Sequence, residues 1–206
     1  PRDIDGSTPL HYASHYGLPR VARALLRGKA NPTYRTYGGL TSLHLACVRG
    51  HGDVVKALLK ADQSAIDLPS AGTGSPVLTP LMFASWAGRE EVVRILLEYN
   101  ASLSLTWAGF TAIDIAKEAR DGTFGANDEL RPLSVLSAQG DSSYGEHAQI
   151  MRLLFRATAE SRRGRADAPA NAEAEVVGGA TAAQAADAKM APVDPAIPNM
   201  ESTAAE

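Results

Sequence analysis

Two histidines near the start of the chain, His11 and His15, stand four residues apart in the segment TPLHYASHYG. On a helix, residues i and i+4 share a face, so the two imidazole rings could bind one metal ion together. No glutamate follows His11, so the pair lacks the general base of the zinc-protease pattern H-E-x-x-H. The single cysteine, Cys47, excludes a C-x-x-C pair as further ligands. We therefore expect the histidine pair to be structural, and we expect neither a metal nor a cofactor.

The rest of the sequence contains no pattern typical of a catalytic site. The glycine-rich stretch at 72–76 lacks the Gly-Lys-Ser/Thr ending of a phosphate-binding loop. The adjacent carboxylates Glu90 and Glu91 stand where a helix is expected to begin, and negative charge there interacts favourably with the helix dipole. No serine lies in a nucleophile elbow. The sequence thus predicts a protein that is not an enzyme.

The composition argues against a nucleic-acid partner and against insertion into a membrane. The 206-residue chain has a formal net charge of −3, which gives no electrostatic reason to expect a nucleic-acid partner. No apolar run approaches the roughly 18 residues of a membrane-spanning helix. One cysteine fits a reducing compartment. We expect a monomer in the cytoplasm, with the nucleus as the alternative, and no direct membrane insertion.

Four stretches of the sequence repeat one pattern, which begins with a threonine suited to cap a helix. These threonines are Thr8, Thr41, Thr79 and Thr111, and successive ones are 33, 38 and 32 residues apart. A second segment with apolar residues at helical spacing follows in each copy, as in the stretch GDVVKALLK. No single copy has enough apolar residues for a core of its own, so the copies must bury them against their neighbours.

The four copies resemble the ankyrin repeat, a family with a period of about 33 residues and the first-helix motif T-P-L-H-x-A. The resemblance covers residues 1–157 and implies an all-α solenoid of helix-turn-helix units with β-hairpin-like finger loops. The matching residues are Thr8-Pro9-Leu10-His11-x-Ala13, Thr41-Ser42-Leu43-His44-x-Ala46, Thr79-Pro80-Leu81-Met82-x-Ala84 and Thr111-Ala112-Ile113-Asp114-x-Ala116.

The resemblance also sets the expected boundaries. The repeats fall at 4–36, 37–74, 75–106 and 107–157, and the last contains an insert at about 120–146. That insert is either a functional loop or a tolerated surface excursion, and we favour the excursion. The segment 158–206 is rich in alanine and proline, contains no aromatic residue and is expected to be a disordered tail.

The motif histidine has a structural role in ankyrin-like repeats, and the residues here are compatible with it. His11 and His44 stand at the third helical position, from which a side chain can reach back to the cap residue. Asp114 could accept the same hydrogen bond, but Met82 cannot, so we expect the third repeat to be less well capped.

In function, the resemblance implies a protein-interaction module, either scaffold or adaptor, that binds another protein through its finger tips and the concave surface of its first helices. Trp86 and Phe110 could instead pack against the next repeat, and for Trp86 the two interpretations are balanced. The alternative function is a targeting or regulatory arm of a larger enzyme or channel whose catalytic domain is absent from this chain; the start at Pro1, without a polar capping repeat, motivates it. The candidate partner-binding residues are Asp5, His15, Tyr16, Tyr37, Leu40, Arg49, Trp86, Trp107 and Phe110.

Overall fold

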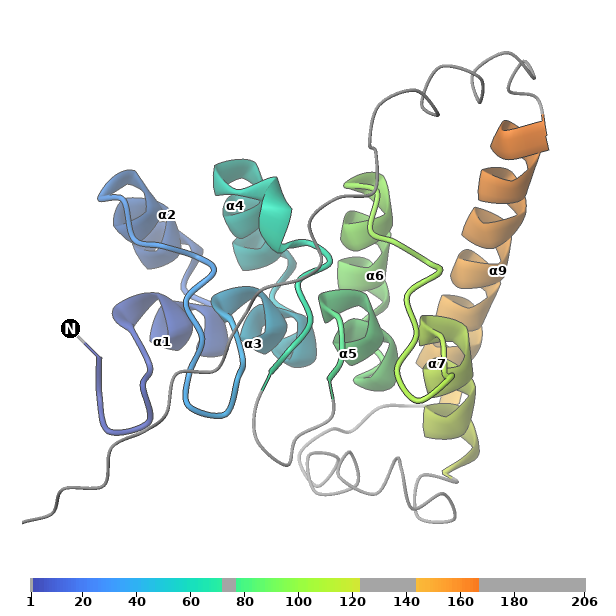
Figure 1. The fold of residues 1–206 in the computed structure, drawn as a ribbon, viewed down its shortest axis with the longest axis horizontal. Helices are drawn as coiled ribbons and strands as arrows, with labels where there is room; N and C mark the ends of the chain where they lie inside the picture. Colours follow the sequence, from blue (N-terminus) through green and yellow to red (C-terminus); the bar gives the residue numbers. More distant parts are fainter. Residues whose placement is uncertain (1, 72–76, 123–143, 167–206) are drawn as a thin grey trace, which may run out of the picture. The chain divides into compact units, whose positions relative to one another are not determined.

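Pairs of helices follow one another along the chain in the computed structural model, which describes residues 2–71, 77–122 and 144–166 (Figure 1). One unit comprises Pro1–Asp167, and the second, Ala168–Glu206, lies outside the described residues. The helices are α1 (Pro9–His15), α2 (Pro19–Arg27), α3 (Ser42–Arg49), α4 (Gly52–Ala61), the short 3₁₀ turn η1 (Gln63–Ala65), α5 (Pro80–Trp86), α6 (Glu90–Glu98), α7 (Ala112–Asp121) and α9 (Tyr144–Ala166).

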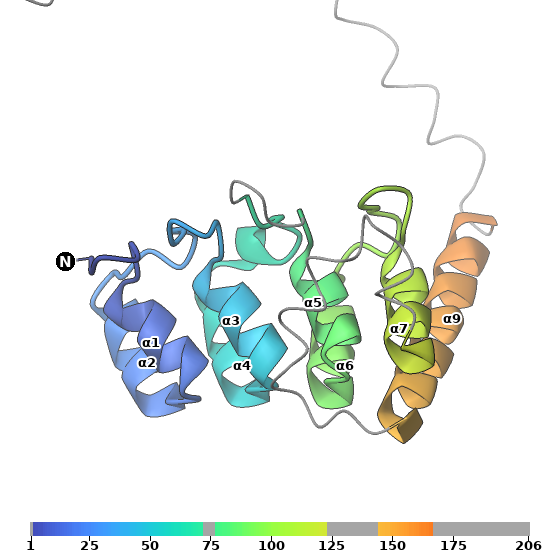
Figure 2. The same ribbon diagram turned by 90° about the horizontal axis from the view of Figure 1, so that it is seen from below.

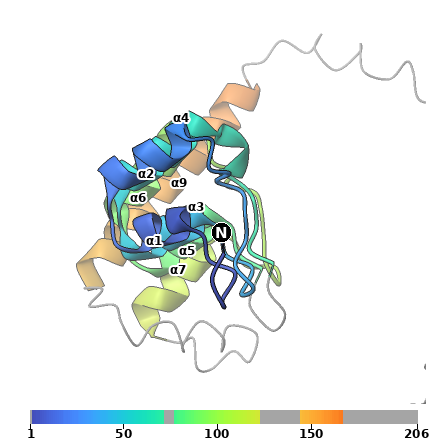
Figure 3. The same ribbon diagram turned by 90° about the vertical axis from the view of Figure 1, so that its left-hand side faces the viewer.

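The helices form two layers. The first helices of the repeats, α1, α3, α5 and α7, pack side by side in chain order, and the second helices α2, α4, α6 and α9 do the same (Figures 2 and 3). Each first helix also packs on the second helix of its own repeat. Among the described residues there is no strand, only isolated bridges that join Arg35 to Thr41 and Trp107 to Phe110 in finger loops. The predicted all-α ankyrin stack is confirmed for this part of the chain.

The last repeat differs in extent from the boundaries expected from the sequence. α7 ends at Asp121 and α9 begins at Tyr144, so most of the insert predicted at 120–146 lies outside the described residues. α9 continues to Ala166, and residues 158–166, which the sequence analysis assigned to the tail, are helical. The rest of the predicted tail lies outside the described residues.

Both motif histidines accept a hydrogen bond from the cap residue of their own helix, and His11 also bonds the chain that follows. The backbone N–H of Thr8 donates to His11 Nδ1 at 3.0 Å, and that of Thr41 donates to His44 Nδ1 at 3.1 Å. Because Nδ1 accepts, the proton of the neutral ring lies on Nε2, and His11 Nε2 donates to the carbonyl of Tyr34 at 3.0 Å. The structural interpretation of His11 is therefore confirmed, and neither of its ring nitrogens is left for a metal ion.

The other two repeats begin as their sequences predict. In the fourth, the N–H of Thr111 donates to Asp114 Oδ2 at 2.9 Å, so the carboxylate replaces the imidazole. In the third, Thr79 Oγ1 accepts from the N–H of Met82 at 3.3 Å, but the thioether returns no hydrogen bond to the cap. The third repeat thus lacks the hydrogen bonds that the His44 imidazole makes with the backbone and hydroxyl of Thr41 in the second.

The core is continuous between the two layers. Its largest fully buried side chains include Leu43, Leu58, Leu81, Phe83 and Leu96, contributed by both layers of the second and third repeats. Cys47 is also fully buried, and burial raises the pKa of its thiol. This shared core fixes the order of the repeats, and it thereby places the finger loops and the ends of the first helices in rows.

Candidate functional site

The first two finger tips lie directly against each other. The N–H of Tyr37 donates to the carbonyl of Asp5 at 2.9 Å, which joins the fingers through their backbones. Gly6 has a φ of +73°, and a Cβ at this position would lie 3.1 Å from the Tyr37 ring. The glycine therefore allows both the turn and the close approach of the ring. Tyr37 remains 70% exposed, Asp5 is exposed and Leu40 is half-buried.

The fourth finger is a tight turn between two aromatic residues. Trp107 and Phe110 exchange backbone hydrogen bonds of 3.0 and 2.8 Å. The two residues between them, Ala108 and Gly109, both have positive φ, as a type I′ hairpin turn requires. Both aromatic side chains are half-buried and pack against the core, so each has one face on the core and one toward solvent.

Two aromatic rings and a guanidinium group form a cluster at the C-terminal ends of α1 and α3. Arg49 Nη2 lies 3.2 Å from His15 Nε2, and the Tyr16 ring stands edge-on to His15 at a centroid distance of 4.9 Å. Burial, followed by the nearby Arg49, lowers the pKa of His15, so its neutral ring can accept a hydrogen bond from the guanidinium. Tyr16, 64% exposed, also stacks against Tyr12. The structure thus brings His15, Tyr16 and Arg49 together from two repeats.

Trp86 differs from the other candidates because its side chain is only 6% exposed. It belongs to the core, and its carbonyl accepts a hydrogen bond from His147 Nε2 of α9 at 3.1 Å. Its buried position fits packing against the neighbouring repeat rather than exposure to a partner. We therefore do not include the Trp86 ring in the proposed partner-binding surface.

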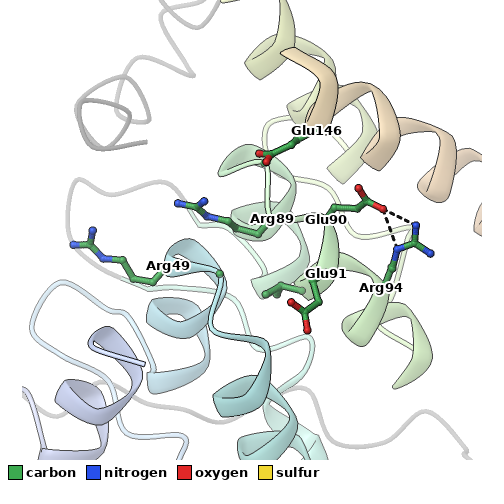
Figure 4. Close-up of a pocket in the computed structure, with 9 residues that line it drawn as sticks. Arg49, Arg89, Glu90, Glu91, Arg94 and Glu146 are labelled. Carbon is green, nitrogen blue, oxygen red and sulfur yellow. Dashed lines mark hydrogen bonds and ion pairs between the residues drawn. The ribbon is translucent and has the colours of Figure 1, made fainter. Parts of the chain in front are cut away.

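Arg89 is a surface cation that the sequence analysis did not select. It lies with Arg49 on a pocket of about 450 Å³, and the two guanidinium groups extend in the same direction (Figure 4). Glu146 and the ion-paired Glu90 and Arg94 line the same pocket, with 2.5 Å between the paired atoms. The sequence does contain a pattern that indicates a role for Arg89. Arg89 follows Gly88, the glycine after the first helix of its repeat, just as His51 follows Gly50.

Arg89 belongs to a recurring contact between neighbouring repeats. Its Nε donates to the carbonyl of Val48 at 3.0 Å, and His51 Nε2 donates to the carbonyl of His15 at 3.1 Å. His147 makes the equivalent bond to Trp86. Each acceptor stands two residues before the glycine that follows its helix, so a side chain of the next repeat satisfies a carbonyl at each helix end. These bonds hold the row of first-helix ends in register.

The described residues also lack the features of two other kinds of site. No group of three or more His, Cys, Asp and Glu side chains in this part of the chain is arranged to hold a metal ion. No helix there is long and apolar enough to cross a membrane.

Comparison with known proteins points to one family. The chain matches the family model described as ankyrin repeats, in three copies, over residues 1–70 and 39–107. It is 37% identical over 97 residues to human Neurogenic locus notch homolog protein 4, covering 47% of this chain and 5% of that protein. It is 36% identical over 135 residues to mouse Ankyrin repeat domain-containing protein 63, covering 59% and 32% of the two chains.

A third relative is a channel. The chain is 31% identical over 102 residues to Transient receptor potential cation channel subfamily A member 1 of Drosophila melanogaster, covering 50% of this chain and 8% of that protein. The chain spans about a third or less of the length of each of these three relatives.

Proposed function

Because this chain belongs to the ankyrin-repeat family, whose members are generally protein-interaction modules, we propose that it binds a partner protein through its finger tips and the ends of its first helices. The supporting observation is that aromatic side chains and arginines from successive repeats gather at the finger tips and at the ends of the first helices. Exposed Tyr37 at the finger tips and the Tyr16–His15–Arg49 cluster at the helix ends are the large amphipathic residues on which binding energy concentrates.

The two groups are well suited to different parts of an interface. Tyr37, Trp107 and Phe110 offer aromatic faces that pay little conformational entropy on binding, because the turns already hold them. Arg49 and Arg89 add cations at the helix ends, where they could pair with carboxylates of the partner. The module needs no catalytic group for this function.

The test is affinity capture of partners by the chain, followed by mass spectrometry and titration of the captured partner with variants. Tyr37→Ala should weaken the complex by roughly 2 kcal/mol, about thirtyfold in Kd, and should leave the thermal transition unchanged because the ring is mostly exposed. Trp107→Ala should weaken it similarly, with some loss of stability because the ring packs on the core.

Phe155→Ala is the matched control, since this exposed aromatic side chain lies on α9, away from the finger loops. If the Kd values of Tyr37→Ala and Trp107→Ala stay within error of that of the unmodified chain, the partner-binding surface is assigned wrongly.

A second candidate function is that of a targeting or regulatory arm in a larger enzyme or channel. The similarity to a cation channel, of which the match covers 8%, favours it. The sequence of the full-length transcript tests it directly: an open reading frame that continues into a channel or catalytic domain supports the arm, and one encoding repeats alone contradicts it.

A further inference from the structure

The helices α2 and α4 lie side by side in the second-helix layer (Figure 1), and a groove of about 1070 Å³ lies along them. We call it the α2–α4 groove. Its lining comes from residues 20, 21 and 23–27 of α2 and from Ala57, Lys60 and Ala61 of α4. The groove belongs to the opposite layer from the first-helix ends considered above, so a ligand here would not compete with one at the finger tips.

Part of the groove's lining is apolar and open to solvent. Val21 is 45% exposed, whereas Val54 and Val92, which occupy the same place in α4 and α6, are fully buried. Ala24 is likewise exposed and Leu25 half-buried. These three α2 residues are spaced i, i+3 and i+4 and therefore form one apolar strip. Leaving such a strip in water costs free energy that a docked apolar surface would recover.

The rest of the lining is cationic. Arg20, Arg23, Arg27 and Lys60 are all exposed, and no Asp or Glu among the residues that the structure describes lines the groove. Within the described ranges, none of these four side chains has an ion-pair or hydrogen-bond partner. The three arginines recur at i, i+3 and i+7, which places them on one face of α2 beside the apolar strip.

The positive charge at the start of α2 runs against local helix energetics. Arg20 lies in the first turn, where the positive end of the helix dipole repels a cation. The other second helices follow the dipole instead, with Asp53 in the first turn of α4 and Glu90 and Glu91 in that of α6. The intrahelical energetics of α2 therefore do not account for Arg20, but attraction of an anionic ligand would.

We propose that the α2–α4 groove is a second docking site and that it binds an acidic amphipathic helix of a partner protein. The apolar strip would receive the partner's apolar face, and the four cations would pair with its carboxylates, as in other helix-in-groove complexes. The nine residues of α2 extend about 13.5 Å, which matches two to three turns of a bound helix. A flat bilayer surface would contact the rim but could not fill the hollow.

The neighbouring repeat would confine the ligand to this place. At the position of Arg27 and Lys60, α6 has Glu98, and Glu90 and Glu91 begin that helix. Glu90 is paired with Arg94 there, so Glu91 and Glu98 are the like charges that an acidic helix displaced toward α6 would meet. The unpaired cations of the groove therefore favour an acidic ligand, and Glu98 disfavours its displacement toward α6.

The experiment uses the full chain and a fluorescent peptide of about 12 residues, three helical turns, with glutamates on one face and leucines on the other. Fluorescence anisotropy measures its Kd at roughly 50 and 300 mM salt, because screening weakens charge pairing. We expect saturable binding that weakens at the higher salt. A peptide with lysine in place of glutamate should not bind.

The decisive variant is Arg20→Glu/Arg23→Glu/Arg27→Glu, which should raise the Kd at least tenfold. Its matched control is Arg152→Glu/Arg162→Glu/Arg163→Glu, which makes the same change in net charge on exposed residues of α9 and should leave the Kd within twofold. Circular dichroism verifies that both variants fold. Val21→Ser should raise the Kd about threefold by removing part of the apolar strip.

Several results would overturn the proposal. One is that the acidic peptide does not bind at all. Another is that both triple variants bind it equally, and a third is that the lysine peptide binds. Binding to vesicles containing about 30% phosphatidylserine without binding to the peptide would assign the cations to a membrane surface instead. Tyr37→Ala should bind the peptide normally. The proposal for the finger-tip surface and the proposal for the α2–α4 groove can therefore fail independently of each other.

Discussion

The second helices of the first and third repeats, α2 and α6, have the same sequence pattern but different surroundings. Val21 and Val92 occupy equivalent positions, yet one is 45% exposed and the other fully buried. The reason is their neighbours among the described helices of the second layer: α6 packs against both α4 and α9, whereas α2 packs against α4. In a stack of repeats, burial is therefore set by the neighbour at least as much as by the repeat's own residues.

The largest expected difference between the two helices is in the cost of a core truncation. Leu96 of α6 is fully buried, and Leu25 of α2, at the same position, is half-buried. Leu96→Ala should reduce the free energy of unfolding by about 2–5 kcal/mol, and Leu25→Ala by less than about half as much. Urea denaturation followed by circular dichroism measures both. Equal costs would mean that α2 contributes to the core as fully as α6.

The pH dependence of stability should also differ between repeats. Burial lowers the pKa of His44 to about 3, well below the ordinary histidine value of about 6.5. The unfolded chain therefore binds a proton that the folded ring does not, so stability is fully present above pH 6.5 and is lost as the pH falls toward 3. His44 alone should remove about 2 kcal/mol between pH 7 and pH 5.

The variant His44→Gln should flatten this pH profile more than His11→Gln, because His44 is the more deeply enclosed ring of the second repeat. Urea denaturation at a series of pH values makes the comparison. A profile that His44→Gln leaves unchanged would mean that other groups take up the protons.

The helix caps provide a smaller test. Asp114 accepts hydrogen bonds from the N–H and, at 2.6 Å, from the hydroxyl of Thr111. Asp114→Ala should cost about 1 kcal/mol, the usual effect of losing a side-chain cap. Lys117→Ala, an exposed residue of the same helix, is the control and should change stability little. A larger loss from the control would indicate that α7 is held by charges along its length.

These contrasts also separate what the sequence could predict from what it could not. His11, His44 and Asp114 each bond a cap threonine three positions earlier, so their capping roles follow from local spacing. The period and the alternation of helices follow from the apolar pattern. These features carry most of the information about the fold.

Exposure was harder to predict, because it depends on contacts between repeats. Nothing in the local pattern separates Val21 from Val54, and nothing separated the buried Trp86 from exposed Tyr37. The role of Arg89 is likewise not visible in the local pattern, because its hydrogen bond to the carbonyl of Val48 joins residues 41 positions apart. The loops and helix ends of the candidate surface follow from the repeat pattern, but which of its side chains are exposed is visible only in the packed structure.

The smallest predicted effects have opposite signs within α2. Arg20 lies at the unfavourable end of the helix dipole and Arg27 at the favourable end. Arg20→Glu should therefore stabilise the chain by about 0.3–1 kcal/mol, and Arg27→Glu should destabilise it by a similar amount, both at low salt. Urea denaturation at low and high salt measures the pair, and salt should reduce both changes.

These two substitutions also link stability to the α2–α4 groove. Both remove a cation from the same lining, so both should weaken the acidic peptide although they change stability in opposite directions. A variant that becomes more stable while it binds less well cannot owe its loss of binding to unfolding. If instead Arg20→Glu destabilised the chain, Arg20 would have a structural partner, and the argument that its charge serves a ligand would fail.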